Sequence, residues 1–447
     1  MANSRNNPSV KLVERVTERL RPLLRAGDRV VVGLSGGLDS VVLLHILTAL
    51  KSELGVSLTA LHVHHGLSPN ADHWLQFAEQ LCRSLDVPFD AERVRVETNS
   101  PEGPEATARR ARYESYVRQD GEWLALAHHR DDQAETMLFN LLRGSGVSGA
   151  AAMPWARGLT GNAKLRILRP LLDVSRAEIE AYARDAKLAW VDDESNRDSR
   201  YARNFLRHKV FPLLRERFPG CDATLARAAN HFAEADALLD ALAQIDATSV
   251  LRDGRVVVAD FAKLEESRAR NLLRHIFKHE GVRMPDSVRL AEMVRQIRTA
   301  AGDRQLSFDL DDLVLNVFRG EVWLVQPIKL PGVTLGWHGE TTFPWGNSSL
   351  CFKAVEGKGI SQDKLNRAEV TISARRGGER FQPDCRRPRR SLKKLMQERD
   401  IAPWQRAALP LLRANDDLVW VPGLGVDCQY QCEPGEPGWL VSWQQGF

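Results

Sequence analysis

The sequence has few cysteines and no long apolar run. Its 447 residues include six cysteines and no CxxC pair, so neither a disulfide framework nor a zinc ribbon is predicted, and a reducing compartment is favoured. No apolar stretch approaches the roughly 18 residues that a membrane span requires. The N-terminal segment MANSRNNPSV is polar and lacks the apolar core of a signal peptide. We therefore expect a soluble, cytoplasmic protein with no membrane partner.

An excess of charge of one sign is also absent. Lys plus Arg number 62 and Asp plus Glu number 58, which leaves a net charge of +4. With 27% charged and 43% hydrophobic residues the composition is that of a globular protein, which excludes wholesale disorder. A near-neutral total does not exclude a nucleic-acid partner, because the basic residues can be unevenly placed. At about 150 residues per domain, the length predicts three domains.

The first part of the chain alternates strand and helix patterns. The β-branched run at 29–34 is followed by the hexapeptide SGGLDS and then by an apolar helical stretch to residue 54. Further strands are predicted at 58–65 and 123–128, with a helix at 71–85 between them. Strands separated by helices predict an α/β fold with a parallel sheet, whose ligands bind at the carboxyl ends of the strands.

The rest of the chain predicts two further domains. Residues 1–218 form the expected first domain, 219–330 a mostly helical or mixed middle domain, and 349–447 a smaller, β-rich α+β domain. The middle domain has a predicted long helix at 222–245, a strand at 255–258 and two helical stretches between 261 and 300, and the last domain has one helix near 391–399. The Pro- and Gly-bearing stretch 331–348 is the predicted linker.

The hexapeptide Ser35, Gly36, Gly37, Leu38, Asp39, Ser40 has the composition of an anion-binding loop. Small residues between a strand and a helix let backbone N–H groups converge on a phosphate, with help from the helix dipole. It is not a Walker motif, since Asp39 stands where that motif has Lys. A carboxylate beside phosphates is useful when it binds Mg²⁺, so Asp39 is the predicted metal ligand. The alternative is a plain turn that caps the helix.

Acidic residues follow the strand predicted at 123–128. Asp132 and Glu135 are three residues apart, so on a helix they project from one face. Paired carboxylates of this kind can hold an ammonium group, whereas the alternative is a solvated acidic first turn of a helix. Arg112 and Arg109 lie at helical spacing in ARRARYE and could contact a phosphate or a substrate carboxylate. Their alternative is an ordinary solvated helix face.

The basic residues gather near the C-terminus. Between residues 373 and 400 there are ten basic and four acidic residues, a difference of +6 that exceeds the net charge of the whole chain. Such a basic cluster is typical of contact with a nucleic-acid backbone, with a solvated basic face as the alternative. A second contact, or an ordinary surface helix, is predicted at Arg203 and Arg207. The cluster's predicted nucleic-acid-binding residues are Arg375, Arg376, Arg380, Arg389, Arg390, Lys393 and Lys394.

SGGLDS resembles the loop of the pyrophosphate-loop ATPases, which cleave ATP between its α and β phosphates. The segments HVHHGLSP, EATARRARYE, HHRDDQAET, GSGVSGAAAM, RPLLDVSR and DESNRDSRYARNFLR resemble, in order and spacing, the long form of tRNA(Ile)-lysidine synthetase, and the resemblance resumes over 375–425. It implies an adenine-nucleotide α-hydrolase-like (Rossmann-like) first domain. It also implies ATP, Mg²⁺, L-lysine and the CAU-anticodon tRNA(Ile) as ligands, with the tRNA bound by the middle domain, by Arg203 and Arg207 and by the basic cluster.

The resemblance implies a ligase that joins lysine to carbon 2 of the wobble cytidine through an adenylated intermediate, with release of AMP and pyrophosphate. It places ATP on residues 35–40 and lysine on Asp132 and Glu135. We expect catalytic roles for Asp39, Arg112 and Asp132, the last as acceptor of a proton from the lysine amine. The alternatives are another pyrophosphate-loop tRNA modifier such as a cytidine thiolase, or a tRNA-binding protein with a degenerate ATP site. The oligomeric state stays open, with a homodimer as one alternative.

Overall fold

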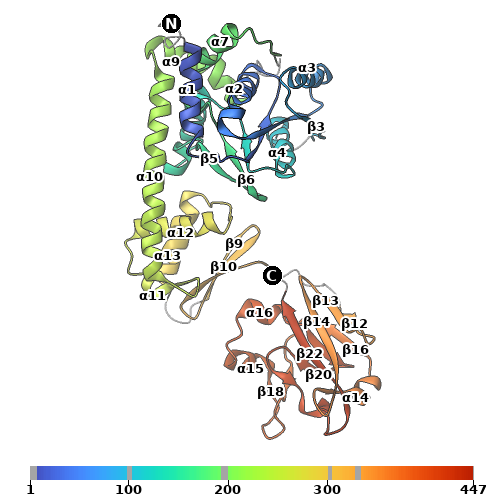
Figure 1. The fold of residues 1–447 in the computed structure, drawn as a ribbon. Coiled ribbons are helices and arrows are strands. Elements are labelled where there is room, and N and C mark those ends of the chain that lie inside the picture. The colour runs from blue at the N-terminus through green and yellow to red at the C-terminus, as the bar shows by residue number, and fades with distance from the viewer. Residues whose placement is uncertain (1–7, 98–102, 193–199, 301–304, 328–333, 446–447) are drawn as a thin grey trace. The chain divides into compact units, whose positions relative to one another are not determined.

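The computed structural model describes residues 8–97, 103–192, 200–300, 305–327 and 334–445. These form two compact units, residues 1–241 and 242–447, and the boundary falls inside helix α10 (Cys221–Val250) (Figure 1). The polar run at 193–199 and the start of the predicted linker, 331–333, lie outside the described residues. None of the helices in the described ranges has the length and apolar content needed to cross a membrane.

The first unit is built on a six-stranded sheet in the order β3-β2-β1-β4-β6-β5. All neighbouring strands pair in parallel except β5 and β6, which pair antiparallel at one edge. The predicted parallel sheet is therefore confirmed. The strands are β1 (Arg29–Gly33), β2 (Ser57–His64), β3 (Phe89–Arg93), β4 (Trp123–Ala125), β5 (Ala156–Leu159) and β6 (Asn162–Leu168).

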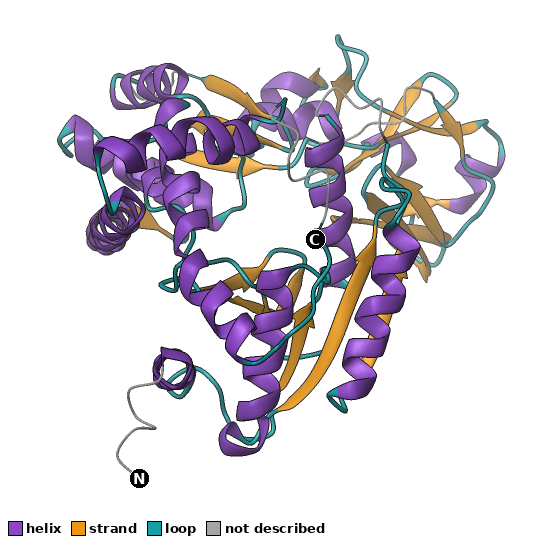
Figure 2. Cartoon of the chain, turned by 90° about the horizontal axis from the view of Figure 1, so that it is seen from above, coloured by secondary structure: helices purple, strands orange, loops and turns teal. Residues whose placement is uncertain are grey.

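Helices connect these strands and cover both faces of the sheet. They are α1 (Pro8–Leu20), α2 (Leu38–Leu54), α3 (Ala71–Ser84), α4 (Pro104–Val117), α5 (Arg130–Leu142), α6 (Val147–Ala150), α7 (Arg176–Asp185), α8 (Ala202–Phe205) and α9 (Phe211–Arg217), with a π-helical turn at Leu206–Val210 between the last two. Val30 and Val32 of β1 face the core that contains α1, α2 and α7, whereas Val31 faces Tyr116 of α4 on the opposite side. Figure 2 shows helices on either side of the strands.

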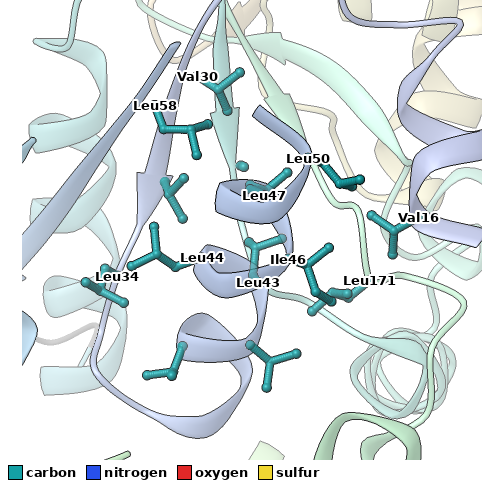
Figure 3. Close-up of a cluster of buried hydrophobic side chains, with 14 of the residues drawn as sticks. Val16, Val30, Leu34, Leu43, Leu44, Ile46, Leu47, Leu50, Leu58 and Leu171 are labelled. Carbon is teal, nitrogen blue, oxygen red and sulfur yellow. The ribbon is translucent and has the colours of Figure 1, made fainter. Parts of the chain in front are cut away.

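Helix α2 is apolar on nearly all sides, as expected for a helix buried within the fold. The labelled side chains of Leu43, Leu44, Ile46 and Leu47 lie along α2 in Figure 3, and each is at most 1% exposed. The helix ends at Gly55, whose φ of +67° is the left-handed conformation that favours glycine at this position. Burial on all sides fixes the position of the N-terminus of α2, and that N-terminus carries the SGGLDS loop.

The strand order reverses beside β1. The chain runs outward from β1 through β2 to β3, and then returns to place β4 on the other side of β1. In open α/β sheets the crevice at such a reversal, outside the carboxyl ends of the strands, is where ligands bind. Here it is flanked by the loop after β1, at 34–37, and the loop after β4, at 126–129.

The first half of the second unit holds more strand than the sequence predicted. Three helices, α11 (Val258–Phe261), α12 (Glu266–His279) and α13 (Ser287–Arg298), share a core with an antiparallel sheet of order β7-β8-β11-β10-β9. The description of 219–330 as mostly helical missed β9 to β11, because these strands are short and turn at Asp311 and Arg319 without an Asn-Gly or Asp-Gly signal. The strands are β7 (Leu251–Arg252), β8 (Arg255–Val257), β9 (Leu306–Leu310), β10 (Leu313–Phe318) and β11 (Glu321–Val325).

The C-terminal part of the second unit contains a five-stranded sheet, β12-β16-β19-β20-β21, a four-stranded sheet, β13-β14-β22-β15, and the β17–β18 pair. The strands are β12 (Leu335–Gly336), β13 (Thr342–Trp345), β14 (Ser348–Glu356), β15 (Ile360–Ser361), β16 (Val370–Ser373), β17 (Arg380–Phe381), β18 (Arg390–Ser391), β19 (Leu411–Ala414), β20 (Asp417–Val421), β21 (Gly425–Val426) and β22 (Pro437–Gln445). The helices are α14 (Gln362–Asn366), α15 (Leu392–Glu398) and α16 (Pro403–Ala408), with a 3₁₀ turn at Cys428–Tyr430. The predicted helix near 391–399 is α15.

The structure adds two features to this region that the sequence did not indicate. The predicted linker 331–348 contains strands β12 and β13, and Trp345 is fully buried and donates from its indole N–H to the Ala408 carbonyl at 2.8 Å. Its proline and glycine residues therefore mark turns and an edge strand instead of a connection between domains. Cys385 and Cys428 are joined by a disulfide across 43 residues of sequence, a pairing that the scattered cysteine positions do not reveal.

Candidate active site

The SGGLDS loop forms a tight turn between β1 and α2. Gly36 has a φ of +87°, and a Cβ built there lies 3.0 Å from Cγ2 of Val191. The hydroxyls of Ser35 and Ser40 lie 3.1 Å apart, and Ser40 also donates to the Gly37 carbonyl at 2.9 Å. The turn leaves the first N–H groups of α2 at the carboxyl end of β1, an arrangement that suits a phosphate.

The loop after β4 brings a second helix N-terminus to the same edge of the sheet. The His129 backbone N–H donates to Asp132 Oδ2 at 3.0 Å, which caps the start of α5. The His129 ring lies between two carboxylates, with Nε2 at 3.4 Å from Asp132 and 3.8 Å from Asp39. The side chains that follow β1 and β4 are thus brought together, as the strand-end argument predicted.

Asp132 and Glu135 form a buried ionic cluster with two arginines from the π-helical region. Arg207 donates from Nε and Nη2 to Glu135 at 2.6 and 2.7 Å, and from Nη2 to Asp132 at 2.7 Å. Arg203 is more distant, at 3.3 Å from Asp132 and 3.4 Å from Glu135. Asp132 is 8% and Glu135 2% exposed, so these carboxylates depend on the arginines for compensation of their charge.

The two aspartates of the site differ in pKa. Burial raises the pKa of Asp39, although the charges of His129 and Arg176 partly oppose that shift. Burial also acts to raise the pKa of Asp132, but His129, Arg203, His128 and Arg207 outweigh it and hold that pKa below its usual range. Asp132 is therefore a stable anion at neutral pH and a weak proton acceptor.

Arg176 is a site residue that the sequence argument did not single out. It begins α7, and its Nη1 donates to both carboxylate oxygens of Asp39, at 2.8 and 2.7 Å. The preceding Ser175 caps α7 through a capping box with Glu178, which fixes where Arg176 projects. The RPLLDVSR segment had been recognised as a motif, and it was the available signal for this residue, which lies 137 positions from Asp39.

The residues of the site fit a metal ion that is brought by a nucleotide better than one that the protein holds by itself. In the described part of the chain no group of three or more His, Cys, Asp or Glu side chains is placed to hold a metal ion. Asp39 alone supplies a carboxylate at the loop. Mg²⁺ commonly uses one or two protein carboxylates and takes its remaining ligands from phosphates and water.

Arg112 and the histidines lie on neighbouring elements. Arg112 lies on α4, and its Nε donates to Nε2 of His65 at 3.3 Å. His65 follows the last residue of β2. Burial and the charge of Arg112 lower the pKa of His65 to about 4. His128, after β4, receives a 3.3 Å hydrogen bond from Arg169, and burial lowers its pKa to about 3. Both rings are therefore neutral at physiological pH.

The seven residues of the basic cluster predicted to bind nucleic acid divide into paired and exposed groups. Arg389 binds the buried Asp427 at 2.7 Å, Arg390 binds Glu398, and Arg375 lies 3.3 Å from Glu379. The side chains of Asp427 and Glu379 are buried, so their pairs with Arg389 and Arg375 hold the fold together, whereas the Arg390–Glu398 pair is exposed and contributes little. Arg376 and Arg380 are exposed and bind Thr334 Oγ1 and the Arg389 carbonyl, and Lys393 and Lys394 project from α15 into solvent.

Three domain-family models match the chain. They describe a PP-loop domain over residues 8–214, a TilS substrate binding domain over 257–323 and a TilS substrate C-terminal domain over 370–443. The first covers the sheet and the candidate site, and the last covers most of the basic cluster.

Curated relatives match over nearly the full length. The chain is 42% identical over 447 residues to the tRNA(Ile)-lysidine synthase of Nitrosomonas europaea, with 99% of this chain and 98% of the relative covered. It is 44% identical to that of Aromatoleum aromaticum, with 94% and 98% covered, and 35% identical to that of Coxiella burnetii, with 94% of each covered. The ATP-binding loop, the buried carboxylates and this similarity agree, and the chain belongs to the tRNA(Ile)-lysidine synthase family.

Proposed function

We propose that this protein uses ATP to join L-lysine to carbon 2 of the wobble cytidine in the CAU-anticodon tRNA(Ile), and that it is a ligase forming a carbon–nitrogen bond. The observation that supports this best is the meeting of a phosphate-type loop and a buried carboxylate pair at one edge of the sheet. His129 lies within 4 Å of both Asp39 and Asp132, so the two half-sites adjoin. A reaction that activates one substrate with ATP and then adds an amine requires this adjacency.

In the first step the cytidine carbonyl oxygen attacks the α phosphate of ATP and pyrophosphate leaves. The N–H groups at the start of α2 receive the charge of the leaving group. Asp39 is the residue that would hold Mg²⁺, which neutralises phosphate charge when bound. Arg176 donates to both carboxylate oxygens of Asp39, so a bound Mg²⁺ would replace that ion pair.

In the second step the lysine amine forms a bond to carbon 2 and AMP leaves with the oxygen. Asp132 and Glu135 are the carboxylates proposed to bind an ammonium group of lysine. The lowered pKa of Asp132 favours this binding role over the earlier expectation that it accepts the amine proton. Arg203 and Arg207, predicted to contact tRNA, are bonded to these same carboxylates, so we now assign them to compensating the charge of Asp132 and Glu135 when lysine is absent. Arg112 remains the proposed contact for phosphate or substrate charge.

The basic cluster is proposed to bind the tRNA backbone mainly through its exposed cations. Lys393 and Lys394 lie next to each other on α15, and Arg376 and Arg380 are exposed. Arg375 and Arg389 are assigned to holding this surface in place, and Arg390 forms an exposed pair with Glu398. We place the reaction in the cytoplasm, where tRNA is available. A homodimer stays a prediction.

The test is transfer of labelled lysine to tRNA(Ile) transcripts with the CAU anticodon, with ATP, lysine and tRNA omitted in turn. We expect label in tRNA only when ATP is present, and pyrophosphate release from ATP and tRNA even when lysine is omitted. Asp39→Asn should abolish both, whereas Glu135→Gln should raise the KM for lysine at least 10-fold with pyrophosphate release retained. Arg21→Gln, an exposed residue of the same unit, is the matched control. ATP consumption without label in tRNA would contradict the proposal.

The alternatives make different predictions in the same assay. A cytidine thiolase would incorporate sulfur instead of lysine. None of the four free cysteines, Cys82, Cys221, Cys351 and Cys432, belongs to the loop or the carboxylate cluster. A non-catalytic tRNA-binding protein would bind tRNA without releasing pyrophosphate.

A further inference from the structure

The disulfide between Cys385 and Cys428 lies in the surface predicted to bind tRNA. The two Cα atoms are 5.3 Å apart, and 43 residues separate them in the sequence. Cys385 is exposed and belongs to the segment 382–389 between β17 and β18, here called the basic loop. Arg386 and Arg387 follow Cys385 directly in the sequence, and both are exposed.

Hydrogen bonds align the two cysteines independently of the bond between their sulfurs. The buried Asp427 accepts from the Gln382 backbone N–H at 2.9 Å and from Arg389 at 2.7 Å, one at each end of the basic loop. The backbone N–H of Cys428 donates to the Gln382 carbonyl at 2.7 Å. These contacts hold the ends of the basic loop against the chain at 427–428. The two thiols therefore remain within reach of each other after reduction.

A pair with this placement has the properties of a redox-sensing site. Disulfides in a reducing compartment are usually transient or regulatory, and an exposed sulfur is the one that a soluble reagent attacks. The neighbouring Cys432 donates its S–H to the Glu436 carbonyl at 3.0 Å, which favours its thiol form over the thiolate that exchange requires. The pair thus combines access, through Cys385, with a prepositioned partner, Cys428.

We propose that Cys385 and Cys428 form a reversible dithiol–disulfide pair that sets how firmly the basic loop is held, and through it the affinity of the C-terminal domain for the tRNA backbone. The proposal rests on the tRNA-binding role given to this domain under the proposed function. The modifying reagent is a low-molecular-weight thiol couple, with glutathione as the probe.

The exchange balances as two successive displacements. The Cys385 thiolate attacks glutathione disulfide, which forms a mixed disulfide and releases one glutathione. The Cys428 thiolate then attacks the Cys385 sulfur and displaces the second glutathione. The two cysteines lose two electrons and two protons, and one glutathione disulfide becomes two glutathione molecules.

The disulfide form should bind tRNA more tightly. The middle of the basic loop is already held by non-covalent bonds, from the Arg386 N–H to Asp384 at 2.9 Å and from Gln431 Nε2 to the Pro383 carbonyl at 3.0 Å. The disulfide adds a covalent link there, so Arg386 and Arg387 lose less freedom when they meet phosphate groups. Ordering two long side chains in advance favours binding by roughly 3- to 10-fold. The dithiol form should keep the same enzyme fold, because the hydrogen bonds to Asp427 remain.

The experiment uses the full chain equilibrated over a range of ratios of reduced to oxidised glutathione. Acid quenching, differential alkylation and mass spectrometry of the peptides give the fraction of Cys385 joined to Cys428, and filter binding gives the tRNA Kd at each ratio. We expect the Kd to fall by the stated factor as the disulfide forms. Cys385→Ser and Cys428→Ser should each remove the dependence on the ratio, whereas Cys351→Ser and Cys432→Ser should keep it.

Two results would overturn the proposal while leaving the tRNA-binding assignment intact. One is a pair that stays reduced at every ratio while tRNA still binds. The other is complete disulfide formation with an unchanged Kd. Failure of tRNA to bind in either form, with the disulfide formed normally, would instead contradict the proposed role of the domain, and with it this proposal. Lysine transfer measured at saturating tRNA should be equal in both forms, since the pair lies outside the candidate active site.

Discussion

Replacing Arg207 by methionine removes the cation that Glu135 and Asp132 share. Arg207 donates to the two oxygens of Glu135 and one of Asp132 at 2.6 to 2.7 Å. Removing one partner of a buried ion pair costs about 3–5 kcal/mol, because the remaining charge is buried without compensation. The Arg207 side chain is 34% exposed and Arg203 stays close, so we expect the lower end, about 3 kcal/mol. For a unit spanning residues 1–241, this lowers Tm by roughly 6–12 °C.

Calorimetry of the full chain without and with L-lysine measures the loss of stability in Arg207→Met and how much of it lysine binding restores. A lysine ammonium between Asp132 and Glu135 replaces the missing cation, so lysine should raise Tm more in Arg207→Met than in the unmodified protein. Arg21→Gln is the control, since it breaks an exposed ion pair with Glu53 and should cost less than about 1 kcal/mol. A loss below about 1 kcal/mol in Arg207→Met, or an equal response to lysine in both proteins, would refute the reasoning.

Three further changes test the site and the basic cluster. Gly36→Ala should weaken ATP binding at least 10-fold in calorimetric titration, because Gly36 has a φ of +87° and an added Cβ would contact Val191. Gly27→Ala is the control: its φ is +94°, but no atom lies near an added Cβ, and it should bind ATP normally. His128 has a pKa of about 3 in the folded protein and an ordinary pKa of 6.5. Between pH 6.5 and pH 3 only the unfolded chain binds a proton at this residue, so the free energy of unfolding falls as the pH is lowered through this window. His128→Asn should reduce this pH dependence by about 1.4 kcal/mol per pH unit. Lys394→Ala should weaken tRNA binding and lower the slope of log Kd against log salt concentration by about one, without altering Tm. Arg389→Ala should lower Tm, because the buried Asp427 loses its cation. If the two variants changed Tm and tRNA affinity equally, the division of the cluster would be wrong.

The positions of the two half-sites could be read from the sequence because they follow strands. A β-branched run and then SGGLDS predict a strand, a turn and a helix, and β1 and α2 have that arrangement. The HHRDDQAE segment follows β4 in the same way, so the parallel sheet brings Asp39 and Asp132 to one edge. Local pattern and one topological rule were sufficient.

The partners of those carboxylates could not be read in the same way. Arg207 binds Glu135 across 72 residues, and Arg176 binds Asp39 across 137. Charge patterns indicate an exposed helix face as readily as a buried ion pair, and only the packing of the π-helical region against α5 decides between them. The same limit explains the division within the basic cluster, since Arg389 and Lys393 are equally basic in sequence but only Arg389 has Asp427 beside it.

The all-round burial of α2 has a thermodynamic consequence for nucleotide binding. The loop proposed to bind ATP begins a helix whose side chains are buried in the core, so the loop has little freedom left to lose when the phosphates bind. Binding free energy that a mobile loop would spend on ordering itself stays available for the transition state. The apolar side chains of α2, remote from any substrate, thereby contribute to the rate of the chemical step.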